Sequence, residues 1–211
     1  MEMFITFEGI EGCGKSTQAR LLYERLKGKC NVILTAEPGG TAIGKAIRDI
    51  LLNSQNKGIE PLAELFLYEA DRAQHVNELI KPALDRGMWV LCDRFCDATL
   101  AYQGYARGQD LTLIALLNEK ATRGLKPALT FLIDCPVEVG LGRARKRNKL
   151  QAMEHKARFE QEPESFHRAI REGYLRLAEQ EPERFEVVDG TLDPQTLGEI
   201  IYEVVVRYLK S

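Results

Sequence analysis

Near the start of the chain, glycines, a lysine and a hydroxyl residue recur at a spacing that suits phosphate binding. Residues 9–16 read Gly-Ile-Glu-Gly-Cys-Gly-Lys-Ser, between an apolar run and a helical pattern. Glycine allows backbone conformations that are closed to residues with a Cβ, so several N–H groups can point at one phosphate. Lys15 adds a cation for the β and γ phosphates, and the Ser16 hydroxyl can ligate Mg²⁺. We therefore predict an ATP site formed by Gly9, Ile10, Glu11, Gly12, Cys13, Gly14, Lys15, Ser16 and Thr17.

A carboxylate and an arginine follow a second apolar run, residues 88–92. Asp93 would hold Mg²⁺ directly or through water together with Ser16, although an aspartate in this position can also only cap a turn. Arg94 is placed to bind a transferred or acceptor phosphate as a bidentate fork. We expect Lys15, Asp93 and Arg94 to be catalytic.

A basic run occupies residues 143–149, with arginines at 143, 145 and 147. Such runs are usually solvated helix faces. This one follows a strand and its helix, as a closing lid would, and its arginines can supply cations to the transition state of phosphoryl transfer. We expect a lid over about 143–160, with Arg143 and Arg147 catalytic and Arg143 and Arg145 on the ATP side. The spacing leaves open which arginine reaches the phosphates.

Alternating strands and helices must position these groups. Five β-rich apolar runs, at 3–7, 31–35, 88–93, 129–134 and 185–189, are separated by helical patterns. This alternation predicts a five-stranded parallel sheet with helices on both faces. Ligands of such sheets gather beyond the carboxyl ends of the strands. Acidic residues end or closely follow all five runs, and we expect them on one rim: Glu8, Glu37, Asp93, Asp134 and Asp189.

The helical patterns vary in how clearly they end. The longest runs from Pro61 to Leu84, where Pro82 predicts a kink. Glycines at 104 and 108 favour a loop over residues 103–108. The other expected helices cover about 18–27, 42–52, 111–122, 137–147 and 165–180, followed by a C-terminal helix that packs on the sheet.

Composition limits the possible classes. The chain has 211 residues and a formal charge of −2, which fits one domain, 1–211, and does not favour a nucleic-acid partner. Five cysteines without a Cys-x-x-Cys pair suit buried thiols in a reduced cytoplasm. We expect neither a signal peptide nor a membrane span.

Four motifs, in order, resemble those of bacterial thymidylate kinases with an arginine-rich lid. They are Phe-Glu-Gly-Ile-Glu-Gly-Cys-Gly-Lys-Ser-Thr-Gln at 7–18, Glu-Pro-Gly-Gly-Thr at 37–41, Asp-Arg-Phe at 93–95 and Ala-Tyr-Gln-Gly at 101–104. The resemblance runs through nearly the whole chain. It implies a three-layer α/β fold of the P-loop nucleoside monophosphate kinases, Mg²⁺-assisted transfer from ATP to dTMP in dTTP synthesis, and a homodimer. The 61–84 helix is the candidate for the dimer interface.

The same resemblance implies roles on the sugar and phosphate side of the acceptor. Glu11 would contact the deoxyribose hydroxyl, and Tyr102 would pack under the sugar. Arg48 and Arg94 would hold the acceptor phosphate. The Glu37-Pro38 segment would position groups, and its peptide bond is expected to be cis.

On the base side, Tyr68 would stack on thymine, and Arg72, one helical turn along, would donate to its exocyclic oxygen. Thr99 and Gln103 would line the base and phosphate side. From the residues alone, Tyr68 and Tyr102 also fit half-buried core aromatics, Arg48 an exposed helix arginine and Thr99 a turn residue. Arg72 also fits a surface pair with Glu69 or Asp71, an interaction worth little.

Some positions depart from the family's pattern. Ala36 stands where many relatives have arginine, Ala98 replaces a common serine, and Ala157 stands where an aspartate is frequent. The segment 148–156 also looks long for a lid. We expect altered lid closure and the same reaction.

Two other functions fit parts of the sequence. In a related deoxynucleoside kinase, Glu37 would act as the base that deprotonates a sugar hydroxyl. A GTPase-like or ATPase-like switch would use the phosphate loop alone, but the Asn-Lys-x-Asp guanine motif is missing; Asp134-Cys135-Pro136 follows the fourth strand instead.

Overall fold

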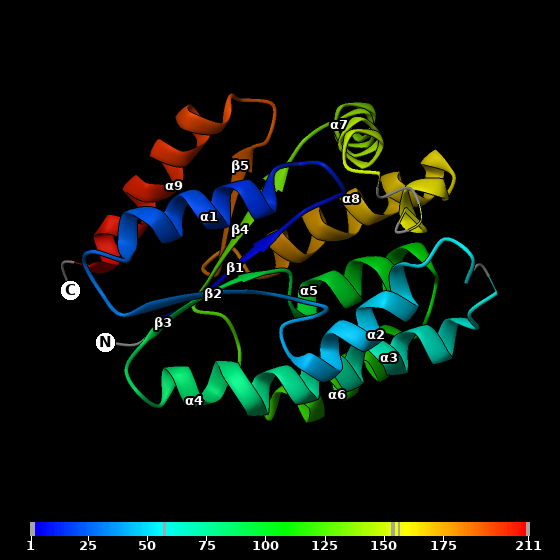
Figure 1. Cartoon of the computed structure of the whole chain (residues 1–211), viewed down its shortest axis with the longest axis horizontal. Coiled ribbons are helices and arrows are strands. Elements are labelled where there is room, and N and C mark those ends of the chain that lie inside the picture. Colours follow the sequence, from blue (N-terminus) through cyan, green and yellow to red (C-terminus); the bar gives the residue numbers. More distant parts are fainter. Residues whose placement is uncertain (1–2, 57, 153–154, 156, 210–211) are drawn as a thin grey trace.

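Five parallel strands form one sheet in the order β2-β3-β1-β4-β5 (Figure 1). The computed structural model describes residues 3–56, 58–152, 155 and 157–209. The strands are β1 (Met3–Glu8), β2 (Val32–Ala36), β3 (Trp89–Asp93), β4 (Leu129–Asp134) and β5 (Phe185–Asp189). All lie where the sequence predicts them, and the predicted parallel sheet is confirmed.

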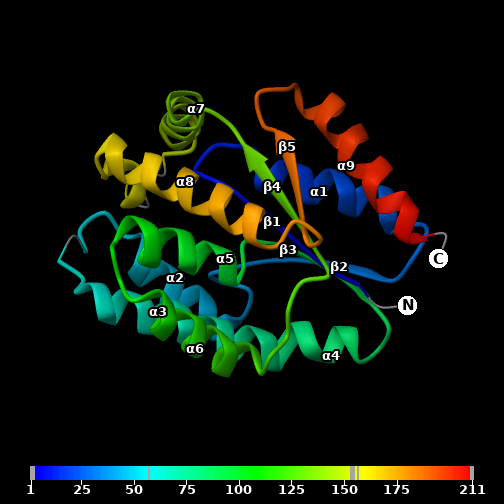
Figure 2. The same cartoon turned by 180° about the vertical axis from the view of Figure 1, so that it is seen from behind.

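Helices flank the sheet on both sides, which gives three layers. In Figures 1 and 2, α1 and α9 lie on one side, and α3, α4 and α6 lie on the other. The α-helices are α1 (Lys15–Leu26), α2 (Ala42–Leu52), α3 (Pro61–His75), α4 (Lys81–Leu84), α5 (Cys96–Thr99), α6 (Leu111–Thr122), α7 (Val137–Leu150), α8 (Glu164–Gln180) and α9 (Pro194–Leu209). Two π-helices, η1 (Val76–Ile80) and η2 (Leu100–Ala106), and a 3₁₀ turn, η4 (Phe159–Gln161), complete the described elements.

Strand side chains alternate between two apolar clusters, as expected for strands that are covered on both faces. Ile5 and Phe7 belong to the larger cluster, where the Phe7 ring stacks on Phe131 with centroids 5.5 Å apart. Phe4 and Val90 point to the smaller cluster, under η1 and α4. The sheet is therefore anchored to both helical layers.

The predicted irregularity of the 61–84 helix near Pro82 is present, whereas the loop predicted from residue 103 is wrong as far as residue 106. The 61–84 helix deforms at η1, one turn before Pro82, because proline lacks an N–H and crowds the carbonyl four residues earlier. Residues 103–106, expected to be a loop, belong to the π-helix η2. Tyr102, Gln103 and Gly104 are buried there, and η2 packs along α8, so tertiary contacts override the glycine signal.

The cysteines are free thiols: Cys13, Cys92 and Cys135 are buried, and Cys30 and Cys96 are half-buried. A search of the described helices finds none with the length and apolar content needed to cross a bilayer.

The loop after β1 packs backbone to backbone on α7. A Cβ on Gly12, whose φ is 70°, would lie 2.0 Å from the Gly140 carbonyl oxygen. A Cβ on Gly140 would in turn lie 2.5 Å from the Glu11 carbonyl oxygen. The helix that begins the predicted lid therefore rests directly on the predicted phosphate loop.

We expect Gly140→Ala to lower the free energy of unfolding by about 1–3 kcal/mol, because the added methyl group separates α7 from the loop. Gly142→Ala is the matched control, since a Cβ at Gly142 meets open space on the same helix. It should be neutral or stabilising by up to about 1 kcal/mol. Urea denaturation measures both, and equal values would contradict the close packing.

Candidate active site

A pocket of about 810 Å³ opens at the carboxyl end of the sheet. It extends from the loop after β1 to the faces of α2, α3 and η2. The predicted site residues that line it are Glu11, Gly12, Lys15, Ser16, Glu37, Pro38, Arg48, Tyr68, Arg72, Asp93, Arg94, Thr99, Tyr102, Gln103 and Arg147. One cavity therefore joins the predicted ATP side to the predicted acceptor side.

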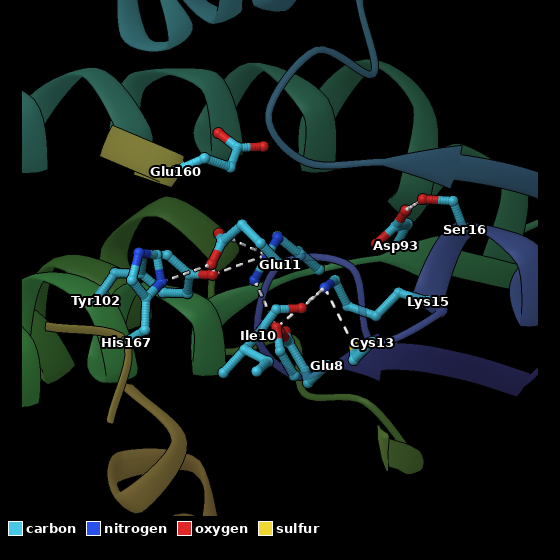
Figure 3. A network of polar contacts seen from close by, with 12 residues as sticks. Glu8, Ile10, Glu11, Cys13, Lys15, Ser16, Asp93, Tyr102, Glu160 and His167 are labelled. Carbon is cyan, nitrogen blue, oxygen red and sulfur yellow. Dashed lines mark hydrogen bonds and ion pairs between the residues drawn. The ribbon is translucent and has the colours of Figure 1, made fainter. Parts of the chain in front are cut away.

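The loop after β1 closes around the ammonium group of Lys15. Lys15 Nζ donates to the Gly9 carbonyl at 3.0 Å and to the Ile10 carbonyl at 2.6 Å, and lies 3.5 Å from Cys13 Sγ (Figure 3). Gly14, with φ 114°, is the N-cap of α1, so the helix begins at the lysine. The positive end of α1 and the lysine thus face the same pocket, an arrangement suited to phosphate. Thr17 is exposed and is not among the described residues that line the pocket.

Ser16 and Asp93 meet at this pocket (Figure 3). Ser16 Oγ donates a short hydrogen bond to Asp93 Oδ2. Mg²⁺ prefers oxygen ligands and is usually held by one or two protein groups, with waters and phosphates completing its shell. The described residues contain no cluster of three or more His, Cys, Asp or Glu side chains that would enclose a metal. A hydroxyl beside a carboxylate fits Mg²⁺ in this open manner.

Arg94 connects the phosphate loop to the aromatic residues of η2 and α8. Its guanidinium donates to the Gly9 carbonyl at 3.1 Å, to Tyr174 Oη at 3.0 Å and to Tyr102 Oη at 2.8 Å. It also pairs with Glu11 Oε1 at 3.2 Å. The Arg94 backbone has a φ of 72°, which is unfavourable for a residue with a Cβ. The contacts of its side chain must offset the cost of this conformation.

Glu11 lies at the centre of a buried polar group. Tyr102 Oη donates to Glu11 Oε1, and His167 Nδ1 of α8 lies 3.3 Å from Glu11 Oε2 (Figure 3). Burial alone would raise the pKa of Glu11, but His167, Arg94 and Lys15 outweigh it and lower the pKa to about 2. The side chain is therefore an anion at neutral pH.

The segment after β2 is held by α2 and α3. The Glu37–Pro38 peptide bond is cis, as predicted. Glu37 accepts from Arg72 Nε at 3.0 Å and lies 2.9 Å from His75 Nδ1. Arg48 donates to the Pro38 carbonyl at 2.7 Å. Both oxygens of Glu37 are thus engaged by α3.

Arg72 is 1% exposed, so the expected alternative of a surface ion pair is wrong. It does pair with Glu69, at 2.7 Å, but inside the protein, and it also donates to Asn118 at 2.7 Å and to the Phe95 carbonyl at 3.1 Å. Arg72 still lines the pocket, and one of its five N–H groups makes none of these contacts. Arg72 is thereby fixed as a donor.

The remaining base-side residues surround the same part of the pocket. Tyr68 is half-buried, and Thr99 is buried with its hydroxyl unpartnered among the described atoms. Gln103 is 1% exposed and donates from Nε2 to Glu64 Oε1 at 2.8 Å.

The three lid arginines differ in position. Arg147 lines the pocket and donates to Asn148, with Glu160 at 3.4 Å. Arg143 instead donates to the carbonyl of Gly190 at 2.6 Å, in the loop after β5. Arg145 is exposed and, with Arg143, is absent from the described lining residues. Within the predicted lid, residues 153–154 and 156 lie outside the described part of the chain.

Only part of the predicted acidic rim lines the pocket. Strand register places Asp93 beside Phe7, and Asp134 beside Asp189, so these strand ends share one edge. Glu37 and Asp93 reach the pocket, whereas Asp134 is held by Arg171 at 2.6 Å. The rim prediction located the correct edge without separating structural from pocket carboxylates.

Several residues that contact the site residues escaped sequence reasoning. On α3, Glu64, Asp71 and His75 contact predicted site residues or the Glu37 segment. They lie three or four residues from Tyr68 or Arg72, so all share one face of the predicted 61–84 helix. This shared face could have identified them. His167 had no such signal, because it reaches Glu11 from a helix far along the chain.

Comparison with known proteins points to one family. The family model described as "Thymidylate kinase" matches residues 7–201. A "Thymidylate kinase" of Geobacter sp. (strain M21) is 56% identical and aligns over 100% of this chain and 94% of its own length. One from Geotalea uraniireducens is 54% identical, with 99% of each chain covered. The crystal structure of thymidylate kinase from Ehrlichia chaffeensis superposes with a TM-score of 0.77 at 34% identity, covering 97% of this chain and 98% of the other.

A buried carboxyl beneath the site leads to a pH prediction. Glu8 accepts from the Phe95 N–H at 2.6 Å and from Tyr174 Oη at 2.8 Å. Burial, and next the charge of Asp97, raise the pKa of Glu8 from 4.5 to about 8. The native state then keeps a proton that the unfolded chain releases, so the free energy of unfolding should fall as pH rises between 4.5 and about 8.

Urea denaturation at pH 6 and pH 9 measures this loss, whose slope is at most about 1.4 kcal/mol per pH unit. Glu8→Gln removes the titration and should lose less stability over the same interval. The exposed variant Glu199→Gln is the control, expected to follow the wild type. Equal losses in wild type and Glu8→Gln would contradict the raised pKa.

Proposed function

The chain belongs to the thymidylate kinase family, and we propose that it transfers the terminal phosphoryl group of ATP to dTMP, forming dTDP and ADP. One observation carries the proposal: a single pocket contains both the Lys15 loop and the base-side group of Tyr68, Arg72 and Gln103. The fold agrees with the nucleoside monophosphate kinase fold of the solved family member.

On the donor side, Lys15 exchanges loop carbonyls for the β and γ phosphates of ATP. Arg147 approaches from the lid, and Arg143 and Arg145 serve the ATP side. Ser16 and Asp93 would hold Mg²⁺, which would neutralise charge on the phosphates. Phosphoryl transfer needs mainly positioning and cations, and these side chains supply them.

On the acceptor side, Arg48 and Arg94 bind the phosphate of dTMP, and Glu11 and Tyr102 contact its sugar. The acceptor phosphate is already largely a dianion at neutral pH, with a second pKa of about 6. The reaction therefore needs no general base. The contacts of Arg94 place its cation between the phosphate loop and η2, where the two substrates would meet.

The base of dTMP fits the remaining wall. Tyr68 stacks on thymine, Arg72 donates to its exocyclic oxygen, and Thr99 and Gln103 line its edge. Arg72 is buried and held by four acceptors, so its remaining N–H group can donate to the base with little loss of side-chain entropy on binding.

The deoxynucleoside kinase alternative is not favoured. Its base would be Glu37, but both carboxylate oxygens of Glu37 already contact Arg72 and His75, and the residue is 4% exposed. A nucleoside would also leave Arg48 and Arg94 without a phosphate.

We further propose that residues 1–211 form one kinase domain with its lid at about 143–160, which acts in the cytoplasm as a homodimer in dTTP synthesis. The dimer would use α2, α3 and α6, which pack side by side. These helices expose large apolar side chains, namely Ile43, Ile50, Leu62, Phe66, Leu111, Leu113 and Leu116. Seven such residues on neighbouring helices resemble an interface more than an ordinary surface.

The assay that tests the function compares dTMP, thymidine and no acceptor, with ATP and Mg²⁺ present. We expect ADP and dTDP in equal amounts when dTMP is the acceptor, and no turnover in the other two reactions. Phosphorylation of thymidine in place of dTMP would support the nucleoside kinase, and ATP hydrolysis without any acceptor would support the switch.

Lys15→Ala and Arg94→Ala should each lower kcat by about 100-fold or more, because each removes a cation from the transferring group. Arg123→Ala is the matched control: Arg123 also has a positive φ, 56°, but it is exposed at the C-terminal end of α6 and is not among the described residues that line the pocket. It should keep full activity. Circular dichroism checks folding, and near-normal turnover in either site variant would refute that residue's role.

Phe66→Glu should convert the dimer to a monomer at micromolar concentration, because it buries an unpaired charge in the interface. Sedimentation velocity measures the mass. Val187→Glu, at a residue that is likewise about half exposed but lies on β5, should remain dimeric. A monomeric wild type would remove the proposal.

A further inference from the structure

The amide of Gln103 is held in one orientation by a buried carboxylate. Gln103 lines the pocket, and its Nε2 donates to Glu64 Oε1 at 2.8 Å. Both residues are 1% exposed. A carboxylate flanked by cations can only accept hydrogen bonds, so it selects the NH₂ half of the amide. The carbonyl oxygen Oε1 of Gln103 is therefore the half left for a ligand in the pocket.

Glu64 is itself fixed from two further directions. Arg158 forms an ion pair with Glu64 Oε2 at 2.6 Å, and Arg107 Nε lies 3.4 Å from Glu64 Oε1. Arg107 is tied in turn to Glu162 at 2.7 Å. The buried Arg158 holds one oxygen of Glu64, which leaves the other oxygen on Gln103, whereas the half-buried Arg107 makes a longer and weaker contact.

Arg72 supplies the opposite polarity at the same wall. Arg72 cannot accept a hydrogen bond, and its contacts with Glu37, Glu69 and Asn118 hold it in place. The base-side wall thus presents a fixed donor from Arg72 and a fixed acceptor from Gln103. The hydroxyl of Thr99 can rotate to donate or accept, so it does not discriminate.

We propose that Glu64 is a positioning residue that sets the choice of pyrimidine by fixing the amide of Gln103. The proposal rests on the proposed function. A base with a carbonyl at C4 and a proton on N3, as in thymine or uracil, matches one donor and one acceptor. Cytosine carries the reverse pattern, an amino group at C4 and an unprotonated N3, and meets like polarity at both positions.

The test measures kcat and KM for dTMP and dCMP in wild type and Glu64→Gln. The amide in the variant can both donate and accept, so Gln103 becomes free to flip. We expect the KM for dTMP to rise about tenfold with kcat within about twofold, as for one lost hydrogen bond. The ratio of kcat/KM for dTMP over dCMP should fall by about the same factor.

Arg107→Met is the matched control, because it also removes a partner of Glu64 but leaves the carboxylate on Gln103. Its dTMP to dCMP ratio should stay within about twofold of wild type. In a Gln103→Met background, adding Glu64→Gln should change the ratio no further, since Glu64 acts through Gln103.

If Glu64→Gln does not fold, Gln103→Met provides the test. It removes the amide through which Glu64 acts and leaves the ion pairs of Glu64 in place. It should lower the ratio about tenfold. An unchanged ratio in Gln103→Met, or in a folded Glu64→Gln, would overturn the inference while wild-type turnover of dTMP leaves the proposed function standing. A wild type that forms no dTDP would overturn both.

Discussion

The interaction on which the site depends is the burial of a charged guanidinium at the end of the sheet. Arg72 is held by Glu37 from the segment after β2, by Glu69 on its own helix, by Asn118 on α6 and by the Phe95 carbonyl after β3. A buried charge is tolerated only when it is paired and hydrogen-bonded. These four elements can therefore occupy only the relative positions that satisfy Arg72, and the wall of the pocket at Arg72 is rigid as a result.

Arg94 imposes the same kind of constraint on the other side of the pocket. Its contacts with Gly9, Glu11, Tyr102 and Tyr174 join the phosphate loop to η2 and α8. Two cationic centres, Arg72 and Arg94, thus set the distance between the proposed acceptor side and the proposed donor side of the pocket. Holding two reactants at a fixed separation removes much of the entropic barrier to their reaction, which is the main contribution a protein makes to phosphoryl transfer.

Two carboxyl groups close in sequence illustrate how neighbours decide charge. Glu11, surrounded by His167, Arg94 and Lys15, has its pKa lowered to about 2 in spite of burial. Glu8, three residues earlier, is buried below the site with Asp97 nearby, and its pKa is raised to about 8. At neutral pH the pocket therefore contains the Glu11 anion, whereas the buried Glu8 carboxyl below it is largely protonated and neutral.

The sequence alone determined the phosphate loop, the five strands, the Asp93-Arg94 pair and the family, because these depend on local spacing and on the period of apolar residues. The sequence also shows that three further residues share a helix face with the predicted base-binding residues: Glu64, Asp71 and His75 with Tyr68 and Arg72. Their role is ambiguous without knowledge of what packs against that face of α3. Only the tertiary structure decided that residues 103–106 are helical, that His167 contacts Glu11 and that Arg147, not Arg143, lines the pocket. Those outcomes depend on contacts between residues distant in the chain, and such contacts follow from how helices pack on the sheet, which no local pattern encodes.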